Sequence, residues 1–270
     1  MTRGAEQTGA EAVAPLYRSD VTEDDFLGGQ LKVLQPKRGY RAGLDAVLLA
    51  AAVAATPGRP MRVLDVGAGV GTVGLCVARR LAAADVVLME RQPELVALAQ
   101  ENIAKNGLEC RASACLAEVG GRAEDLERAG LEPGSFTHVL ANPPYYAAGA
   151  ATPSEEMLKS ASHVMSGDDF EAWGRFMARM AGSQGQAIIV HKVEALPQIL
   201  AALEKRFGGL KVLPIHPRSG EAANRVIVTG IKGSRAPLSV RSGFILHGEG
   251  NGFTPAADAI LRGGGGLDLG

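Results

Sequence analysis

An asparagine, two prolines and a tyrosine follow an apolar segment in the middle of the chain: Asn142-Pro143-Pro144-Tyr145 comes directly after residues 136–141. Proline fixes φ at about −65° and has no backbone N–H, so this turn is rigid and its carbonyl groups stay available as acceptors. A planar group with an NH2 could donate to the Asn142 side-chain oxygen and to a proline carbonyl while its ring stacks on Tyr145. The turn therefore suits an exocyclic amine whose nitrogen lone pair points at an electrophile, although by itself it fits an ordinary loop after a strand equally well.

A glycine-rich turn lies upstream, between the apolar segment Arg62–Val66 and a helical pattern that runs from Val70 to about Ala82. Strand, glycine turn and helix begin a nucleotide-binding α/β unit, in which glycines let the backbone approach a ligand closely. The next predicted strand ends in Glu90, about 20 residues past the glycines, where a carboxylate can accept hydrogen bonds from both hydroxyls of an adenosine ribose.

Glycines at 69, 71 and 74 also match the dinucleotide fingerprint, so they do not separate a nicotinamide or flavin from other nucleotides. Asp65 favours a different ligand. It precedes the first glycine by two residues, where its charge opposes a pyrophosphate and attracts a cationic ligand with an amino-acid tail, such as S-adenosylmethionine. The alternative is that nearby loop N–H groups satisfy the Asp65 carboxylate, which then has no ligand.

Alternating strand and helix patterns must position these turns. Apolar segments predict strands at 86–90, 113–116, 136–142, 186–190, 210–215 and 225–231, and helical periodicity predicts helices at 94–106, around Trp173 and Phe176, and from Pro197. This order predicts a parallel sheet between helices, with ligands bound at the carboxyl ends of the strands. Before it we expect a hairpin over 26–34 and a helix that Asp45 caps.

Composition bounds the class of protein. The chain has 270 residues, of which 46% are hydrophobic, so it can bury a full core. The three cysteines lack metal-binding spacing, the first residues do not form a signal peptide, and no apolar run is as long as a membrane span. We therefore expect a cytoplasmic protein with reduced thiols and no metal site.

Charge gives no overall sign of nucleic-acid binding, because the formal net charge is −1. Two local groups of cations could contact phosphates if they flank the Asn142 turn, or could be ordinary solvated surface. They are Lys32, Lys37, Arg38 and Arg41 before the predicted core, and Arg218, Arg225, Lys232, Arg235 and Arg241 in the last third.

Asp65-x-Gly67-x-Gly69-x-Gly71, an acidic end to the second core strand and Asn-Pro-Pro-Tyr after the fourth form a familiar combination. Over roughly residues 24 to 232 the chain resembles the class I S-adenosylmethionine-dependent methyltransferases that act on amino groups. Within them it is most similar to the bacterial tRNA1(Val) adenine-37 N6-methyltransferases, through 43–49 (Gly-Leu-Asp-Ala-Val-Leu-Leu) and 215–220 (Ile-His-Pro-Arg-Ser-Gly). That family usually has Gly-Thr-Asp where this chain has Gly43-Leu44-Asp45.

The resemblance implies a doubly wound, Rossmann-like α/β fold with a mostly parallel seven-stranded sheet, an antiparallel last strand and a short N-terminal extension. We expect a disordered tail over 1–22 and a hairpin and helix covering the donor pocket over 23–58. The methyltransferase core would span 59–235, and a C-terminal extension with a flexible end at Gly263–Gly266 would span 236–270.

The resemblance also assigns roles to residues. The donor S-adenosylmethionine would contact Asp65, Gly67, Ala68, Gly69, Gly71, Glu90, Arg91, Glu118 and Asp45. The catalytic turn would be Asn142, Pro143 and Tyr145, and the substrate would contact Pro144, Tyr146, Lys159, His163 and Arg218. The long segment 146–167 would be a substrate gate.

A sulfonium methyl group is already activated, so the protein would mainly align it with the amine, which is worth about 7–11 kcal/mol. We expect N6-methylation of an adenine in tRNA. The alternatives are a glutamine side-chain amide of a protein, DNA, a small amine, and a nicotinamide-dependent oxidoreductase that transfers no methyl group. The protein-amide alternative is less favoured, because those enzymes usually carry a helical N-terminal domain and few residues precede the predicted core here.

Overall fold

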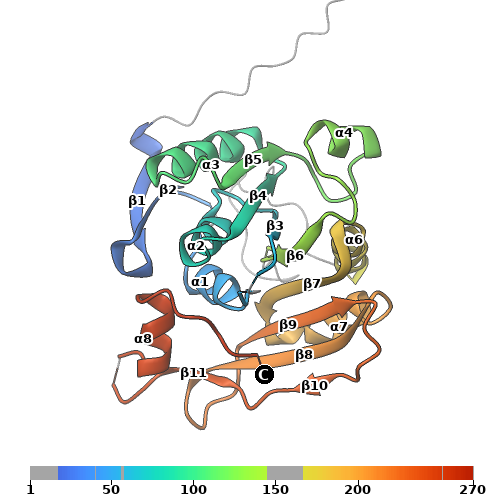
Figure 1. Cartoon of the computed structure of the whole chain (residues 1–270). Coiled ribbons are helices and arrows are strands. Elements are labelled where there is room, and N and C mark those ends of the chain that lie inside the picture. Colours follow the sequence, from blue (N-terminus) through green and yellow to red (C-terminus); the bar gives the residue numbers. More distant parts are fainter. Residues whose placement is uncertain (1–17, 40, 56–57, 145–166, 251, 270) are drawn as a thin grey trace, which may run out of the picture.

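A sheet of nine strands crosses the centre of the molecule, with helices on both of its faces (Figure 1). The structure is a computed structural model that describes residues 18–39, 41–55, 58–144, 167–250 and 252–269. Seven strands form the core, in the spatial order β5-β4-β3-β6-β7-β9-β8. They are β3 (Met61–Val66), β4 (Ala84–Glu90), β5 (Ala112–Leu116), β6 (Phe136–Ala141), β7 (Ala181–Lys192), β8 (Phe207–Arg218) and β9 (Arg225–Lys232).

The core strands are parallel except β9, which runs antiparallel to β7 and to β8. The predicted doubly wound, Rossmann-like sheet with an antiparallel last strand is therefore confirmed. Two strands that the sequence did not predict extend it beyond β8: β10 (Ser239–Val240) and β11 (Phe244–His247). They are too short for an apolar pattern, and they form because the free edge of β8 supplies their hydrogen bonds.

Helices cover both faces of the sheet, and strand side chains alternate between two apolar clusters. In β7, Ile188 and Val190 belong to one cluster and Ala187 and Ile189 to the other. The first cluster contains side chains of α1 (Leu44–Ala51), α2 (Thr72–Arg80), α3 (Pro93–Lys105) and α8 (Pro255–Leu261). The second contains side chains of α4 (Ala123–Arg128), α6 (Gly167–Met180) and α7 (Leu196–Leu203). Among the described residues, no helix is both long and apolar enough to cross a membrane.

A hairpin of β1 (Val21–Phe26) and β2 (Leu31–Pro36) precedes the core and packs beside α3 (Figure 1). This confirms the predicted hairpin and lengthens both of its strands. The buried Gln35 side chain then fixes the segment that follows: its Nε2 donates to Ala42 O at 3.4 Å, and its Oε1 accepts from Ala42 N at 2.8 Å. The hairpin therefore fixes the path of the chain into α1.

Asp45 does not cap α1, so that prediction is wrong. The helix begins at Leu44, with Gly43 at the N-cap position and Asp45 within the first turn. A carboxylate there suits the positive end of the helix dipole. Its Oδ2 accepts from Arg225 Nε of β9 at 3.0 Å, a partner 180 residues away that local sequence cannot reveal.

The glycine-rich segment expected to be a flexible end packs against α1 and α2. Arg80 Nε donates to Gly264 O at 3.0 Å and to Gly265 O at 3.2 Å. Leu267 is buried, and its N–H donates to Ala51 O at the end of α1 (2.8 Å). These bonds satisfy carbonyl groups that a helix end and an irregular segment would otherwise leave unpaired.

Candidate active site

The two turns singled out in the sequence lie side by side at the carboxyl edge of the sheet. β3 and β6 are parallel neighbours, and Val66 is paired with Ala141. The next residues of the two strands are Gly67, which begins the glycine-rich turn, and Asn142. Because paired strands lie about 4.8 Å apart, a ligand on the first turn would face a ligand on the second.

The glycines of the first turn serve different purposes. Gly67, Gly69 and Gly71 have φ values of +67°, +57° and +89°, which favour glycine. A Cβ on Gly71 would lie 2.6 Å from Leu88 Cδ1, so this glycine lets α2 pack closely on β4. Around Gly69, in contrast, no atom of the described residues lies within 4 Å of the position a Cβ would take, so its backbone is accessible to a ligand.

Glu90 ends β4 and holds the glycine-rich turn. Its side chain is buried, Oε2 accepts from Gly69 N at 2.9 Å, and Oε1 accepts from Arg91 N at 2.8 Å and from Gln92 N at 3.0 Å. An ionised carboxylate offers about four acceptor positions. About one position therefore remains for a further donor such as a hydroxyl, rather than the two that the sequence suggested.

Asp65 is almost completely buried in β3, where its Oδ2 accepts from Gly74 N at 3.0 Å. Burial raises its pKa to about 7, the Glu90 charge adds to the increase, and the Gly74 hydrogen bond opposes it. Two buried carboxylates thus converge beside the glycine-rich turn. They oppose a pyrophosphate and favour a ligand with a positive charge, while the Gly74 bond also fits the alternative of a carboxylate satisfied by the loop.

Ala68, Arg91 and Glu118 lie at the same edge. Ala68 N donates to Met89 O at 2.9 Å. Arg91 follows β4 directly, Glu118 lies two residues after the end of β5, and both are exposed. Ala117 N donates to Glu90 O at 2.9 Å, which brings the segment after β5 against the end of β4. The structure thus brings these predicted donor contacts together at one edge.

The acceptor turn, Asn142-Pro143-Pro144, has a neighbour in β7 that the sequence patterns did not predict. Asn142 is half-buried, Pro143 is buried and Pro144 is exposed. The buried His191 of β7 has its pKa lowered mainly by burial, and the nearby backbone of Pro144 and Lys192 opposes that shift. A histidine near the carboxyl end of an apolar strand was the available signal.

Two aromatic side chains of α6 reach this edge. The Phe170 ring meets the His191 imidazole edge-on, with ring centroids 5.3 Å apart. A Cβ on Gly67 would lie 2.8 Å from Trp173 Cη2, so the indole packs directly on the beginning of the glycine-rich turn. Helix α6 therefore contacts the glycine-rich turn through Trp173 and the ring of His191 through Phe170.

The remaining predicted site residues have different placements. Tyr145, Tyr146, Lys159 and His163 lie outside the described residues. Arg218 ends β8, which β7 and β9 separate from β6, and its Nη1 donates to Gly248 O at 3.0 Å and to Gly250 O. Arg218 is therefore not brought against Asn142.

Several cations of the two predicted basic groups have partners within the chain. Lys32 Nζ lies 3.0 Å from Asp25 Oδ1, and Arg41 Nη2 lies 2.5 Å from Asp24 Oδ2. Lys232 Nζ donates to Ala178 O at 2.8 Å and to Ala181 O at 2.7 Å. Fewer cations thus remain for phosphates than the sequence suggested, with Lys37 and Arg38 among the exposed ones.

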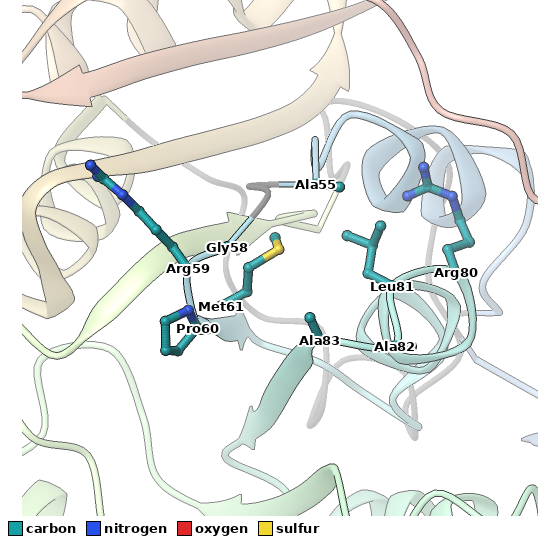
Figure 2. A pocket seen from close by; sticks show the side chains of 9 residues that line it. All are labelled: Ala55, Gly58, Arg59, Pro60, Met61, Arg80, Leu81, Ala82 and Ala83. Atoms are coloured by element: carbon teal, nitrogen blue, oxygen red, sulfur yellow. The ribbon is translucent and has the colours of Figure 1, made fainter.

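A hollow at the opposite edge of the sheet is not part of this site (Figure 2). It lies between the residues that lead into β3 and those that lead into β4, at the amino ends of both strands. Its lining includes the Arg59 and Arg80 side chains. Because ligands of open parallel sheets bind at the carboxyl ends, the site is assigned to the edge with Gly67 and Asn142.

Comparisons with known proteins agree with this geometry. Residues 43–168 match the family model of the methyltransferase small domain. A solved structure of a predicted O-methyltransferase from Agrobacterium tumefaciens is 37% identical, with a TM-score of 0.69, over 83% of this chain and 98% of that one. The T. thermophilus 16S rRNA N2 G1207 methyltransferase, solved with AdoMet and guanosine, shares the fold at 21% identity and a TM-score of 0.53, over 78% of this chain and 50% of that one.

Curated relatives act on two kinds of acceptor. The release factor glutamine methyltransferase of Escherichia coli K12 is 26% identical over 185 residues, which are 67% of this chain and 56% of the relative. The tRNA1(Val) (adenine(37)-N6)-methyltransferase of Shewanella sp. W3-18-1 is 27% identical over 191 residues, 70% of this chain and 76% of the relative. The chain thus spans little more than half the length of the first.

Fold, motifs and relatives together define the class of protein. The chain belongs to the class I S-adenosylmethionine-dependent methyltransferases, and its methyl donor is S-adenosylmethionine.

Proposed function

We propose that this methyltransferase acts on an exocyclic amine, the N6 group of an adenine in tRNA. The observation that supports this is the position of Asn142-Pro143-Pro144 beside the glycine-rich turn, set by the pairing of Val66 with Ala141. A turn that offers a side-chain carbonyl and backbone carbonyls matches the two N–H bonds of an amine. A hydroxyl has a single O–H to donate, so the same turn suits it less well.

The residues at the carboxyl edge fit the donor. Gly69 leaves its backbone accessible, and Glu90 keeps about one acceptor position for a ribose hydroxyl. Asp65, in its ionised form, adds negative charge that suits the cationic amino-acid tail. S-adenosylmethionine supplies an electrophilic methyl group on a sulfonium. Its cationic character is the reason why two buried carboxylates favour it over a dinucleotide.

Asn142 and Pro143 would orient the acceptor. Their oxygens accept from the two amine N–H bonds, which directs the nitrogen lone pair away from the turn and toward the glycine-rich side. Positive charge develops on that nitrogen during methylation, and acceptors fixed in advance stabilise it without reorganising. We expect Tyr145 to stack on the base, which is worth about 1–3 kcal/mol. The proton lost afterwards can leave to water.

The adenine of a tRNA is preferred to other amines on two grounds. Exposed Lys37 and Arg38 lie in the segment that leads to α1, whose first turn reaches β9 at the carboxyl edge through Asp45, and they could contact phosphates. The likeness to the Shewanella enzyme also covers 76% of that protein. A protein glutamine remains the second candidate, because its planar carboxamide also carries an NH2 and the E. coli relative modifies one.

Incubation with labelled S-adenosylmethionine and unmodified bulk tRNA, followed by nucleoside analysis, tests the proposal. We expect label in N6-methyladenosine, and about 10²- to 10³-fold slower labelling when Asn142 is replaced by alanine. A parallel incubation offers a release factor in place of tRNA. Label in a glutamine of that protein, with none in tRNA, would replace the first candidate by the second, and label on a ribose or phenol oxygen would contradict both.

A further inference from the structure

Asn102 is a polar residue that is completely buried in α3. Its Oδ1 accepts from Leu34 N at 2.7 Å, and its Nδ2 donates to Leu34 O at 3.0 Å and to Val70 O at 3.0 Å. Leu34 belongs to β2 of the hairpin, and Val70 belongs to the glycine-rich turn. One side chain thus joins the hairpin, α3 and the turn expected to bind the donor.

Asn106, one helical turn later, provides a comparison. Its Oδ1 accepts from Lys32 N at 3.0 Å, and its Nδ2 donates to Lys32 O at 2.8 Å. The two asparagines therefore pair with alternate residues along β2, as a neighbouring strand would. The bond beyond β2 differs between them: Asn102 Nδ2 donates to Val70 O of the glycine-rich turn, whereas Asn106 Nδ2 donates to Asn102 O at 2.8 Å within the end of α3.

Of the two carbonyls that accept from Asn102, that of Val70 lies between two glycines of the glycine-rich turn. Val70 is flanked by Gly69, whose backbone is accessible, and by Gly71, which packs against Leu88. Gly71 N donates to Ala68 O at 2.9 Å, which is a hydrogen bond within the turn. The bond from Asn102 Nδ2 to Val70 O holds the same turn to α3. A buried bond to a flexible glycine segment restricts conformations that glycine would otherwise visit freely.

We propose that Asn102 is a positioning residue, which holds the glycine-rich turn in its ligand-binding conformation and couples that conformation to docking of the β1–β2 hairpin. The coupling reaches further, because Gln35 links β2 to Ala42 just before α1. The part of this inference that concerns donor binding rests on the proposed donor site at Gly69.

Hydrogen–deuterium exchange of the protein without donor tests the structural part. Asn102→Ala is expected to speed exchange in residues 67–72 and in β2, whereas Asn106→Ala is expected to speed exchange in β2 alone. Equal effects of the two variants on residues 67–72 would overturn the proposal, because loosening of the hairpin would then account for the faster exchange in both variants. If Asn102→Ala does not fold, Asn102→Ser, which keeps a small polar side chain, is compared in the same way.

Calorimetric titration with S-adenosylmethionine tests the functional part. Asn102→Ala is expected to weaken donor binding by about ten-fold, the equivalent of one buried hydrogen bond, and Asn106→Ala by less than about two-fold on the same scale. With donor at saturation, kcat and the KM for the acceptor should stay near wild type, which a general loss of structure would not permit. Unchanged donor affinity in Asn102→Ala would overturn this part. If the wild type itself does not bind the donor, the proposed donor site fails, while the exchange experiment still decides the role of Asn102.

Discussion

At the scale of single residues, the two sides of the site should have separable effects on kinetics. Asn142 and Pro143 should act on the acceptor, and the carboxylates of Asp65 and Glu90 should act on the donor. They lie on different strands and bind different parts of the reacting pair in the proposed complex. Kinetic constants for the donor and for the acceptor therefore distinguish their roles.

Replacing Asn142 by alanine removes an acceptor that is used when charge develops on the amine. We expect kcat to fall by about 10²- to 10³-fold, as for loss of one preorganised polar contact, while the donor dissociation constant changes by less than about two-fold. Asn142→Asp keeps an oxygen acceptor at the same place and should lose less. Equal losses of donor affinity and of kcat in Asn142→Ala would contradict the assignment.

Replacing Glu90 by alanine should act on the donor side. The variant loses the acceptor for Gly69 N, Arg91 N and Gln92 N together with the position left for a ribose hydroxyl. We expect donor affinity to fall at least about ten-fold, because two or more hydrogen bonds to a charged group are lost. Calorimetric titration measures this directly, and NADH serves as the control ligand. Binding of NADH in preference to S-adenosylmethionine by the wild type would refute the donor assignment.

At the scale of elements, the close contact of α2 with β4 fixes where the glycine-rich turn ends and α2 begins. A Cβ on Gly74 would lie 2.2 Å from Leu88 Cδ2 and 2.8 Å from Val86 Cγ1. Overpacking of this kind typically costs about 1–3 kcal/mol, so Gly74→Ala should lower the free energy of unfolding by at least that amount. Chemical denaturation measures the loss.

Gly69→Ala separates packing from ligand access. Its φ of +57° strains any other residue, but the described residues leave the space beside it open. Gly107, with a φ of +62° and an equally open position among those residues, provides the matched control. Both alanine variants should lose about 1 kcal/mol of stability, but Gly69→Ala alone should lose donor affinity. Equal affinity in the two variants would show that the donor does not approach Gly69.

Sequence patterns predicted the elements that periodicity defines and missed those that depend on distant partners. The core strands and the placement of Gly67 and Asn142 followed from apolar segments and turn residues. The bond from Arg225 to Asp45 and the packing of Trp173 on Gly67 involve residues far apart in the chain. Nothing local marks such pairs, because the fold alone brings them together. Asn102 and Asn106 belong to the same category.

At the scale of the whole molecule, two buried groups in neighbouring strands should shape the pH dependence of stability. Burial raises the pKa of Asp65 in β3 from 3.8 to about 7 and lowers the pKa of His138 in β6 from 6.5 to about 4. Between pH 3.8 and 7, folded Asp65 keeps a proton that the unfolded chain releases, so its contribution to stability falls as pH rises. Between pH 4 and 6.5 the unfolded chain binds a proton that folded His138 does not, so its contribution rises with pH.

Each contribution changes by about 1.4 kcal/mol per pH unit in its window, so the two nearly cancel between pH 4 and 6.5. The Asp65→Asn variant should reveal the two opposing contributions, because it lacks that of Asp65 and keeps that of His138. We expect the variant and the wild type to have similar stability at pH 4, and the variant to become progressively more stable relative to the wild type until pH 7, with no further change above it. Chemical denaturation at several pH values measures the difference. A difference independent of pH would show that Asp65 does not titrate in this range.

The same carboxylate links stability to the proposed function. A cationic donor tail favours the ionised form of Asp65, so donor binding below pH 7 should release a proton, and affinity should increase as pH rises toward 7 and then level off. Asp65→Asn should bind the donor more weakly and lose this pH dependence, although it is the more stable protein at pH 7. The release is measured from the dependence of the binding enthalpy on the ionisation enthalpy of the buffer. Tight, pH-dependent binding in Asp65→Asn would assign the proton to another group and leave Asp65 as a carboxylate satisfied by Gly74 alone.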